Sequence, residues 1–351
     1  MDKSRIAIVS PSGKFYGSEQ VLFDFLKTTK FQYEVYVPCG AFHDRLIEQG
    51  VHQVHVYVSA KKLYMELSLR MLLNKIDGIY INEGGHSRYV TLLSKLFPWK
   101  RFFVHIRLLE DTWQTRLGHG RKNIEYISIS DYITREVQRN TGIHCHTVHD
   151  LYVSTQEHKF QPVPDTDVIR AGIVGRVTDT KGLADVVKFC RYIEAKSDVE
   201  KQIELHFYGA INKDSTLATS FVEESKTYKN VKCVFHGFVN NKDEIYGGGV
   251  NLILHFNRVE PLGRIYLEAV DYCRLLIGFD SGGIGEIAHS LNLDSFVVNA
   301  AIEEWEPELT SILFNVSTRW TPEVYKTALR YMSISFSPVA YTRYIEKLFY
   351  E

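Results

Sequence analysis

The sequence has few cysteines, and no two of them have the spacing of a metal or redox motif. The five cysteines are an odd number scattered along 351 residues: Cys39, Cys145, Cys190, Cys233 and Cys273. This pattern argues against a disulfide framework and against a zinc site built from thiolates. It favours a reducing compartment, and we expect the protein to be in the cytoplasm.

Long apolar runs and a net charge are also missing. The start, MDKSRIAIVSPSG, has only a short apolar run, and no later stretch approaches the roughly 18 residues of a membrane-spanning helix. With 41 Lys and Arg against 42 Asp and Glu, the formal net charge is -1, so no global field attracts nucleic acid. We therefore expect a protein that is neither exported nor integral to a membrane, and that has no nucleic-acid partner.

Several common catalytic motifs are absent as well. The glycine-bearing loop Pro11–Glu19 matches neither the dinucleotide motif G-x-G-x-x-G nor a P-loop, which argues against a nicotinamide dehydrogenase and a P-loop kinase. The chain also lacks the G-x-S-x-G motif of serine hydrolases.

What the sequence does contain is the composition of a globular protein, with 45% hydrophobic and 24% charged residues. Short β-branched runs alternate with helix-like stretches, which predicts an α/β fold with parallel sheets. The runs lie at 5–10, 33–38, 54–58, 78–82, 101–107, 126–130, 168–175, 203–209, 231–237, 250–256, 275–280 and 295–299.

The break in this pattern predicts two Rossmann-like domains, residues 1–160 and 161–336, which we expect to face a central cleft. The polar, proline-bearing stretch 154–167 is interpreted as the linker. Thr321-Pro322 and Ser337-Pro338 predict the starts of two final helices, and the helix 337–351 is expected to pack back on the first domain.

Open α/β sheets bind ligands beyond the carboxyl ends of their strands, so the loops after the strands are where chemistry is expected. The loop after 168–175 carries two cations, Arg176 and Lys181, before a helix that Asp179 or Thr180 could cap. An Arg fork and a Lys charge aimed at one place suit a diphosphate. The same residues could instead be a capped helix with two solvated cations.

The loop after 250–256 contains Glu260-Pro261-Leu262-Gly263-Arg264 and continues to Glu268. Pro261 fits the first position of a helix, which would leave the amide groups of residues 262–264 unpaired as an anion site. Carboxylates beside such a site suit the hydroxyls of a nucleotide sugar, although they could also be solvated helix glutamates. The loop 280–286, with three glycines, allows close approach of a ligand to the backbone.

Taken together, these segments resemble the retaining glycosyltransferases of family 4, which have the GT-B fold. The resemblance rests on GRVTDTKG, IELHFYG, VKCVFHGFV, EPLGRIYLEA and FDSGGIGEI in that order, and more faintly on YGSEQVL, FVHIR and YISISDYI. Its most specific element is the pair Glu260 and Glu268 at an E-x7-E spacing. The chain departs from the family where Ala269–Leu275 lacks the usual Gly and Pro, and where Gly17-Ser18 replaces Gly-Gly.

The resemblance implies a role for each matching residue. Arg176 and Lys181 would clamp the diphosphate of a nucleotide-diphosphate sugar, Glu268 would accept the ribose hydroxyls, and Glu260 would contact the transferred sugar. The backbone at Leu262, Gly263 and Arg264 would bind the far phosphate, and the backbone of Phe238 would contact the base edge. Gly17 would let the acceptor domain approach the donor phosphates, and His105 would lie beside the reacting sugar. Glu260, His105, Arg176 and Lys181 are the expected catalytic residues.

No cofactor beyond the donor and no metal is expected. Asp165-Thr166-Asp167 has the D-x-D pattern of metal-dependent glycosyltransferases but precedes a strand in the linker. His144, Cys145, His146 and His149 are ligand types at strand-like spacing, which lets only some of them face one way.

The region 60–122 has 12 basic residues against 5 acidic ones, and in it Leu92, Leu93, Leu96 and Phe97 recur at helical spacing. Apolar and basic residues together suit a surface that contacts anionic lipid. A helix that packs in the core and exposes its cations would explain the same pattern equally well. We therefore expect a saccharide or lipid-linked saccharide acceptor, in bacterial surface polysaccharide synthesis, with contact at the inner face of the cell membrane. Trp113 and Arg116 are candidate acceptor contacts.

Two other functions remain open at this point. One is a nucleotide-sugar epimerase of the same fold, which would need no acceptor. The other is a catalytically silent glycosyltransferase-like partner, which the charged residues Arg176, Lys181, Glu260 and Glu268 argue against.

Overall fold

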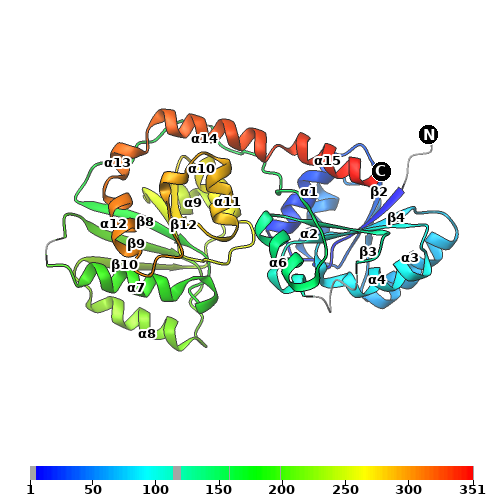
Figure 1. The fold of residues 1–351 in the computed structure, drawn as a ribbon, viewed down its shortest axis with the longest axis horizontal. Helices are drawn as coiled ribbons and strands as arrows, with labels where there is room; N and C mark the ends of the chain where they lie inside the picture. Colours follow the sequence, from blue (N-terminus) through cyan, green and yellow to red (C-terminus); the bar gives the residue numbers. More distant parts are fainter. Residues whose placement is uncertain (1–4, 114–119, 158, 198, 351) are drawn as a thin grey trace. The chain divides into compact units, whose positions relative to one another are not determined.

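A computed structural model describes residues 5–113, 120–157, 159–197 and 199–350 of the chain. The chain divides into two compact units, residues 1–153 with 334–351 and residues 154–333 (Figure 1). The division falls after Val153, and the following residues Ser154 and Thr155 bond to Asp271 of the second unit. No helix in the described ranges combines the length and the apolar character needed to cross a bilayer.

The first unit is built on a parallel sheet whose strands follow the order β3-β2-β1-β4-β5-β6-β7. The strands are β1 (Arg5–Val9), β2 (Gln32–Val37), β3 (Val54–Val56), β4 (Gly78–Ile81), β5 (Arg101–Ile106), β6 (Ile124–Ser128) and β7 (His146–Thr147). The helices are α1 (Gly17–Thr28), α2 (Ala41–Glu48), α3 (Ala60–Leu72), α4 (Ser87–Leu96), α6 (Asp131–Thr141) and α15 (Pro338–Tyr350), with short 3-10 turns η1 (Gly84–His86) and η2 (Leu109–Thr112).

The second unit has a parallel sheet in the order β10-β9-β8-β11-β12-β13. Its strands are β8 (Val168–Val174), β9 (Gln202–Tyr208), β10 (Val231–Gly237), β11 (Leu252–His255), β12 (Leu275–Phe279) and β13 (Val297–Val298). Its helices are α7 (Leu183–Glu194), α8 (Thr216–Glu224), α9 (Lys242–Gly247), α10 (Arg264–Asp271), α11 (Gly282–Ser290), α12 (Glu306–Phe314), α13 (Val316–Arg319) and α14 (Pro322–Ser335), with 3-10 turns η3 (Asp179–Lys181), η4 (Ser225–Thr227) and η5 (Asp294–Phe296).

The central strands of both sheets are covered on both faces, as is typical of parallel sheets. Residues Ile6–Val9 of β1 and all of β12 are buried, which explains why these strands are continuous apolar runs rather than alternating ones. In the second unit, α7 and α8 cover one face of the sheet, and α9, α10 and α11 cover the other (Figure 1). The α/β fold with parallel sheets that the sequence predicts is confirmed.

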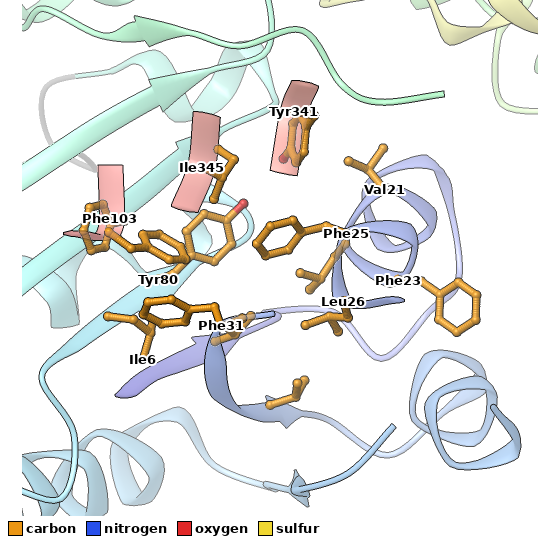
Figure 2. Close-up of a cluster of buried hydrophobic side chains, with 14 of the residues drawn as sticks. Ile6, Val21, Phe23, Phe25, Leu26, Phe31, Tyr80, Phe103, Tyr341 and Ile345 are labelled. Atoms are coloured by element: carbon orange, nitrogen blue, oxygen red, sulfur yellow. The ribbon is translucent and has the colours of Figure 1, made fainter. Parts of the chain in front are cut away.

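The last helix of the chain completes the core of the first unit. Tyr341, Ile345, Leu348 and Phe349 of α15 lie on one helical face and are buried, with Phe349 packing on Phe103 at a ring distance of 4.7 Å. Figure 2 shows Phe25 of α1, Tyr80 of β4 and Ile345 of α15 directed into the same cluster. Since a buried side chain of this size stabilises by about 1.5–3 kcal/mol, α15 is an integral part of this unit.

Candidate functional site

Two loops that the sequence singles out follow neighbouring strands of the second unit. β8 and β11 are adjacent and parallel, with Leu252 opposite Ala171. Their carboxyl ends therefore meet at the same edge of the sheet, which brings the loop after Gly175 close to the loop after His255.

The two loops are joined by an ion pair. Lys181 Nζ donates to Glu260 Oε2 at 3.0 Å, and Asn257 Nδ2 donates to the same oxygen at 2.7 Å. His255 Nε2 lies 3.9 Å from it. One carboxylate oxygen therefore faces two donors and an imidazole, at the position where strand β11 ends.

Gly182 explains how the loop brings Lys181 to the end of β11, beside Glu260. Gly182 has a φ of 79°, and a Cβ there would lie 2.2 Å from the backbone oxygen of Phe256. Only glycine lets the first loop lie against the end of β11. The expected helix cap was wrong: Gly182 is the N-cap of α7, Lys181 belongs to the 3-10 turn before it, and Asp179 instead accepts a hydrogen bond from Ser215 Oγ.

The surroundings of Glu260 keep its side chain ionised. Burial by itself raises the pKa of this carboxyl group, but the charge of Lys181, the nearby His255 and the hydrogen bonds from Lys181 and Asn257 outweigh it, so the pKa is lowered. At neutral pH, Glu260 is a fixed negative acceptor that can bind hydroxyl groups.

His255 is held neutral at the same place. Burial lowers the pKa of His255 to about 4, with Glu260 opposing that shift and Lys181 adding to it. Unfolded chains bind a proton on histidine below about pH 6.5, whereas this histidine does not until about pH 4. The free energy of unfolding of the second unit is therefore expected to fall as the pH drops from 6.5 towards 4, by up to about 1.4 kcal/mol per pH unit from this group.

Denaturation followed by fluorescence of the buried Trp305 and Trp320, both in the second unit, measures this effect. His255→Asn should reduce the slope of the free energy of unfolding against pH between pH 4 and 6.5. An unchanged slope would show that His255 titrates normally.

The segment after Glu260 differs from the sequence prediction. The helix α10 begins at Arg264 and not at Pro261, because Gly263 precedes it with a left-handed φ of 86°. The amide of Gly283 donates to the backbone oxygen of Glu260 at 2.8 Å, and a Cβ on Gly283 would lie 2.3 Å from the Cα of Leu262. Here, the glycines of the loop 280–286 allow close packing of two protein loops.

Leu262 and Gly263 still offer backbone donors. Neither amide donates a hydrogen bond to another residue in the described parts of the chain, and the Leu262 side chain is buried. The two amides stand before α10, where a helix N-terminus favours negative charge.

The second glutamate of the E-x7-E pair has different partners from the first. Glu268 lies on α10 and accepts from Lys242 Nζ at 2.8 Å and from Tyr246 OH at 3.1 Å, both from α9. Glu260 and Glu268 are therefore held by separate elements.

Arg176 and Phe238 are exposed at the ends of β8 and β10. Arg176 makes no hydrogen bond or ion pair with any residue within the described ranges. Phe238 is 77% exposed and follows Gly237, whose φ is 72°. Both residues are accessible to a ligand, but the structure does not join either one to the Lys181–Glu260 pair.

Three further residues belong to this site and were not predicted from the sequence. His255 and Asn257 flank the end of β11, where polar residues follow a buried strand, and that change in polarity was the available signal. Arg258 forms a two-armed ion pair with Asp185 of α7, with both N–O distances at 2.9 Å, and its guanidinium lies 4.0 Å from the ring centre of Phe279. The positions of Arg258 and Asp185 in the sequence do not predict this contact.

In the first unit, Gly17 is the first residue of α1 and His105 lies in β5. His105 is fully buried: Tyr80 OH lies 2.6 Å from its Nδ1, and its Nε2 has no hydrogen-bond partner in the described structure. Burial and the adjacent Arg107 hold the pKa of His105 well below its ordinary value, so this imidazole is neutral at pH 7.

Of the two candidate acceptor contacts, only Trp113 lies within the described residues. Trp113 follows η2 and is 59% exposed. Arg116 lies outside the described residues.

Two of the residues considered as metal ligands make other contacts. Asp165 pairs with Lys201, and His146 Nε2 lies 3.1 Å from Glu125 Oε2. Within the described ranges, no group of three or more His, Cys, Asp or Glu side chains is placed to hold a metal ion.

Comparisons with known proteins agree with this architecture. Residues 154–319 match the family model described as glycosyl transferases group 1. No curated protein matches the chain in sequence. Among solved structures, the chain is similar to HepE from Anabaena in complex with UDP and glucose, with 18% identity, 99% of both chains covered and a TM-score of 0.72.

Two further structures are similar over most of their length. A glycosyltransferase from Rickettsia africae has 12% identity and a TM-score of 0.72, covering 99% of this chain and 98% of that one. The lipopolysaccharide outer core galactosyltransferase WaaB has 15% identity and a TM-score of 0.64, covering 94% of this chain and 99% of that one. The chain thus has the GT-B fold, and the match of residues 154–319 to the glycosyl transferases group 1 model supports a glycosyltransferase.

Proposed function

We propose that this protein is a retaining glycosyltransferase of family 4, which moves a sugar from a nucleotide-diphosphate sugar to a hydroxyl of a saccharide or lipid-linked saccharide. The observation that carries the proposal is the Lys181–Glu260 pair at the joined ends of β8 and β11, inside a glycosyl transferases group 1 domain. The complexes of HepE with UDP and with UDP-glucose make UDP-sugars the first donors to test.

The chemistry requires fixed positive charge near the leaving group. When the bond from the sugar to the phosphate breaks, negative charge grows on the diphosphate and positive charge on the anomeric carbon. We assign Lys181 and the exposed Arg176 to the diphosphate, together with the amides of Leu262 and Gly263. These groups stabilise the leaving group without a metal ion.

Glu260 is assigned to the hydroxyls of the transferred sugar. Its pKa is lowered, so it stays ionised and accepts hydrogen bonds, while Asn257 fixes its orientation at 2.7 Å. When the donor binds, the direct contact between Lys181 and Glu260 would be broken. Lys181 would then bind the phosphate, and Glu260 would accept hydrogen bonds from the sugar. Glu268 is assigned to the ribose, where hydroxyls would take the place of Lys242 or Tyr246.

The remaining assignments concern the base and the first unit. We assign the backbone of Phe238 to the base, the amide of Arg264 to the far phosphate, Gly17 to the approach towards the phosphates, and His105 to the reacting sugar. The role of His105 requires its surroundings to open, because its side chain is buried. Trp113 and Arg116 remain the proposed acceptor contacts, and a bacterial surface polysaccharide remains the proposed product, made at the inner face of the membrane.

The donor site is tested by thermal unfolding with nucleoside diphosphates and their sugar conjugates, with magnesium or with EDTA. A ligand at 100 times its dissociation constant stabilises the native state by about 2.7 kcal/mol. We expect one nucleotide-sugar group to raise the melting temperature equally in magnesium and in EDTA, and Arg176→Ala to weaken this effect. A strict need for magnesium would contradict the metal-free mechanism.

Release of the nucleoside diphosphate separates the three functions. A transferase releases it only with an acceptor, an epimerase interconverts the sugar alone, and a silent partner does neither. The ionised Glu260 beside Lys181 favours the transferase over the silent partner, because a site that has lost its activity has no need to keep this charge pair.

A further inference from the structure

Two helices of the first unit stand side by side on its surface. Tyr64 of α3 stacks on Tyr89 of α4, with ring centres 4.8 Å apart and planes within 6° of each other. His86, just before α4, lies against the same two rings. Figure 1 shows α3 and α4 as neighbours in this unit.

The outward face of α3 is apolar. Met65, Leu69 and Leu72 recur at positions i, i+4 and i+7, and each is exposed over more than half of its surface. The inward face has its own apolar row, with Leu63, Leu67 and Met71 buried. A helix packed on a sheet needs only one apolar face, so the core does not account for the outward row.

The neighbouring helix has a second exposed apolar pair. Leu92 and Leu96 of α4 follow the spacing i and i+4 and are more than half exposed, whereas Leu93 and Phe97 are buried. Trp99, three residues after the end of α4, is also more than half exposed. Leu92, Leu93, Leu96 and Phe97 recur at the predicted helical spacing, but only Leu92 and Leu96 are exposed, and Leu93 and Phe97 belong to the core. We call these six exposed side chains the apolar surface of the first unit: Met65, Leu69, Leu72, Leu92, Leu96 and Trp99.

Basic side chains surround this surface. Lys61, Lys62, Lys75, Arg88 and Lys95 are exposed on or beside the two helices, against the exposed acid Glu66 on α3. Two other cations nearby are engaged inside the unit, since Arg70 pairs with Glu34 and the buried Lys100 bonds to the Ile76 carbonyl at 2.9 Å. Exposed apolar rows with a rim of lysines match a membrane surface that carries anionic lipids.

We propose that α3 and α4 dock this protein on an anionic bilayer, with Met65, Leu69, Leu72, Leu92, Leu96 and Trp99 entering the interface and the lysines contacting lipid phosphates. A tryptophan at the edge of such a surface suits the headgroup region. A second copy of the chain fits less well, because two copies packed through this surface would bring their lysine rims together. The inference rests on the proposed lipid-linked acceptor, which it would bring within reach.

Binding to vesicles tests this apolar surface without any sugar transfer. A protein that does not bind vesicles but still transfers sugar would therefore contradict this inference and not the proposed function. The full-length protein is sedimented with phosphatidylcholine vesicles that contain or lack 30% phosphatidylglycerol, at low and high salt. We expect binding only to anionic vesicles and loss of binding at high salt. Lys62→Gln with Lys95→Gln should weaken binding about fivefold per lysine, and Leu69→Ser with Leu96→Ser about tenfold or more.

Matched controls keep the result specific. Ile47→Ser with Val339→Ser removes two exposed apolar side chains of the same unit outside this surface, and Lys213→Gln with Lys326→Gln removes two exposed lysines of the second unit. Both control variants should bind as the unaltered protein does. All the replaced side chains are exposed, so the melting temperature should stay unchanged and report intact folding.

Trp99 provides a direct readout. Trp305 and Trp320 are buried, so in a Trp113→Phe background Trp99 is the only exposed tryptophan of the chain. Its emission should shift to shorter wavelength on anionic vesicles. Absence of vesicle binding, equal loss in the control variants, or a dimer in solution that Leu69→Ser with Leu96→Ser dissociates would each overturn the proposal.

Discussion

Lys181→Ala is expected to lower the rate of sugar transfer by about 10² to 10³-fold and to weaken the binding of nucleoside diphosphate. The reason is that a preorganised cation is lost from the position where charge develops on the leaving group, and removing one such donor costs about 2.7–4 kcal/mol. Lys181 is well placed for this because Gly182 fixes its loop against the end of β11. Turnover kinetics and calorimetry of nucleotide binding measure the two effects separately.

Glu260→Ala is the paired variant that distinguishes a role in binding the sugar from a role in binding the diphosphate. It should lower transfer by a similar factor but leave the affinity for nucleoside diphosphate nearly unchanged, because Glu260 is assigned to the sugar and its removal frees Lys181 from their 3.0 Å contact. Lys226→Ala, which removes an exposed lysine of the same unit that pairs with Glu223, should change neither quantity. Equal loss of nucleotide binding in the Lys181 and Glu260 variants would show that Glu260 is assigned to the wrong group.

Much of the architecture could be predicted because strands of a parallel sheet carry a strong local signal. The predicted strand at 231–237 coincides with β10, and the predicted starts at Pro322 and Pro338 coincide with those of α14 and α15. Buried β-branched runs and proline at the first helical position do not depend on distant parts of the chain.

The errors arose where distant contacts override local preference. Pro261 favours a helix start, but Gly263 turns left-handed so that residues 260–262 can pack on Gly282 and Gly283. On α4, two apolar rows lie next to each other, and spacing alone cannot tell which one faces the core. Lys181 and Glu260 are 79 residues apart, and their contact depends on β8 and β11 being neighbours, which strand patterns do not reveal.

Asp150→Ala is expected to destabilise the first unit by about 3–5 kcal/mol. Asp150 forms an ion pair with Arg107 in which both side chains are at most 4% exposed. Burial opposes the charge on Arg107, but Asp150 outweighs it, so the pKa of Arg107 is raised above its ordinary value. Without Asp150, the guanidinium keeps its 2.9 Å bond to the Asn82 carbonyl but has no counter-ion in a region that excludes water.

The effect should extend to His105, which connects this network to the proposed chemistry. Arg107 lies within hydrogen-bond distance of His105 Nδ1, at 3.4 Å, and Tyr80 contacts the same nitrogen at 2.6 Å. We therefore expect Asp150→Ala to speed hydrogen exchange in the peptides of β5 while leaving those of β8 and β11, in the second unit, unchanged. Exchange measured peptide by peptide separates the stability of the two units, which a single melting curve would mix.

The double variant Arg107→Leu with Asp150→Leu distinguishes an unpaired buried charge from a simple loss of packing. Replacing both members of a buried pair by apolar side chains removes the uncompensated charge, and this costs much less than removing one partner. The double variant should therefore be more stable than Asp150→Ala, with slower exchange in β5. If the two are equally unstable, the contribution of Asp150 comes from its packing and hydrogen bonds and not from its charge, and the proposed electrostatic link from Asp150 through Arg107 to His105 is wrong.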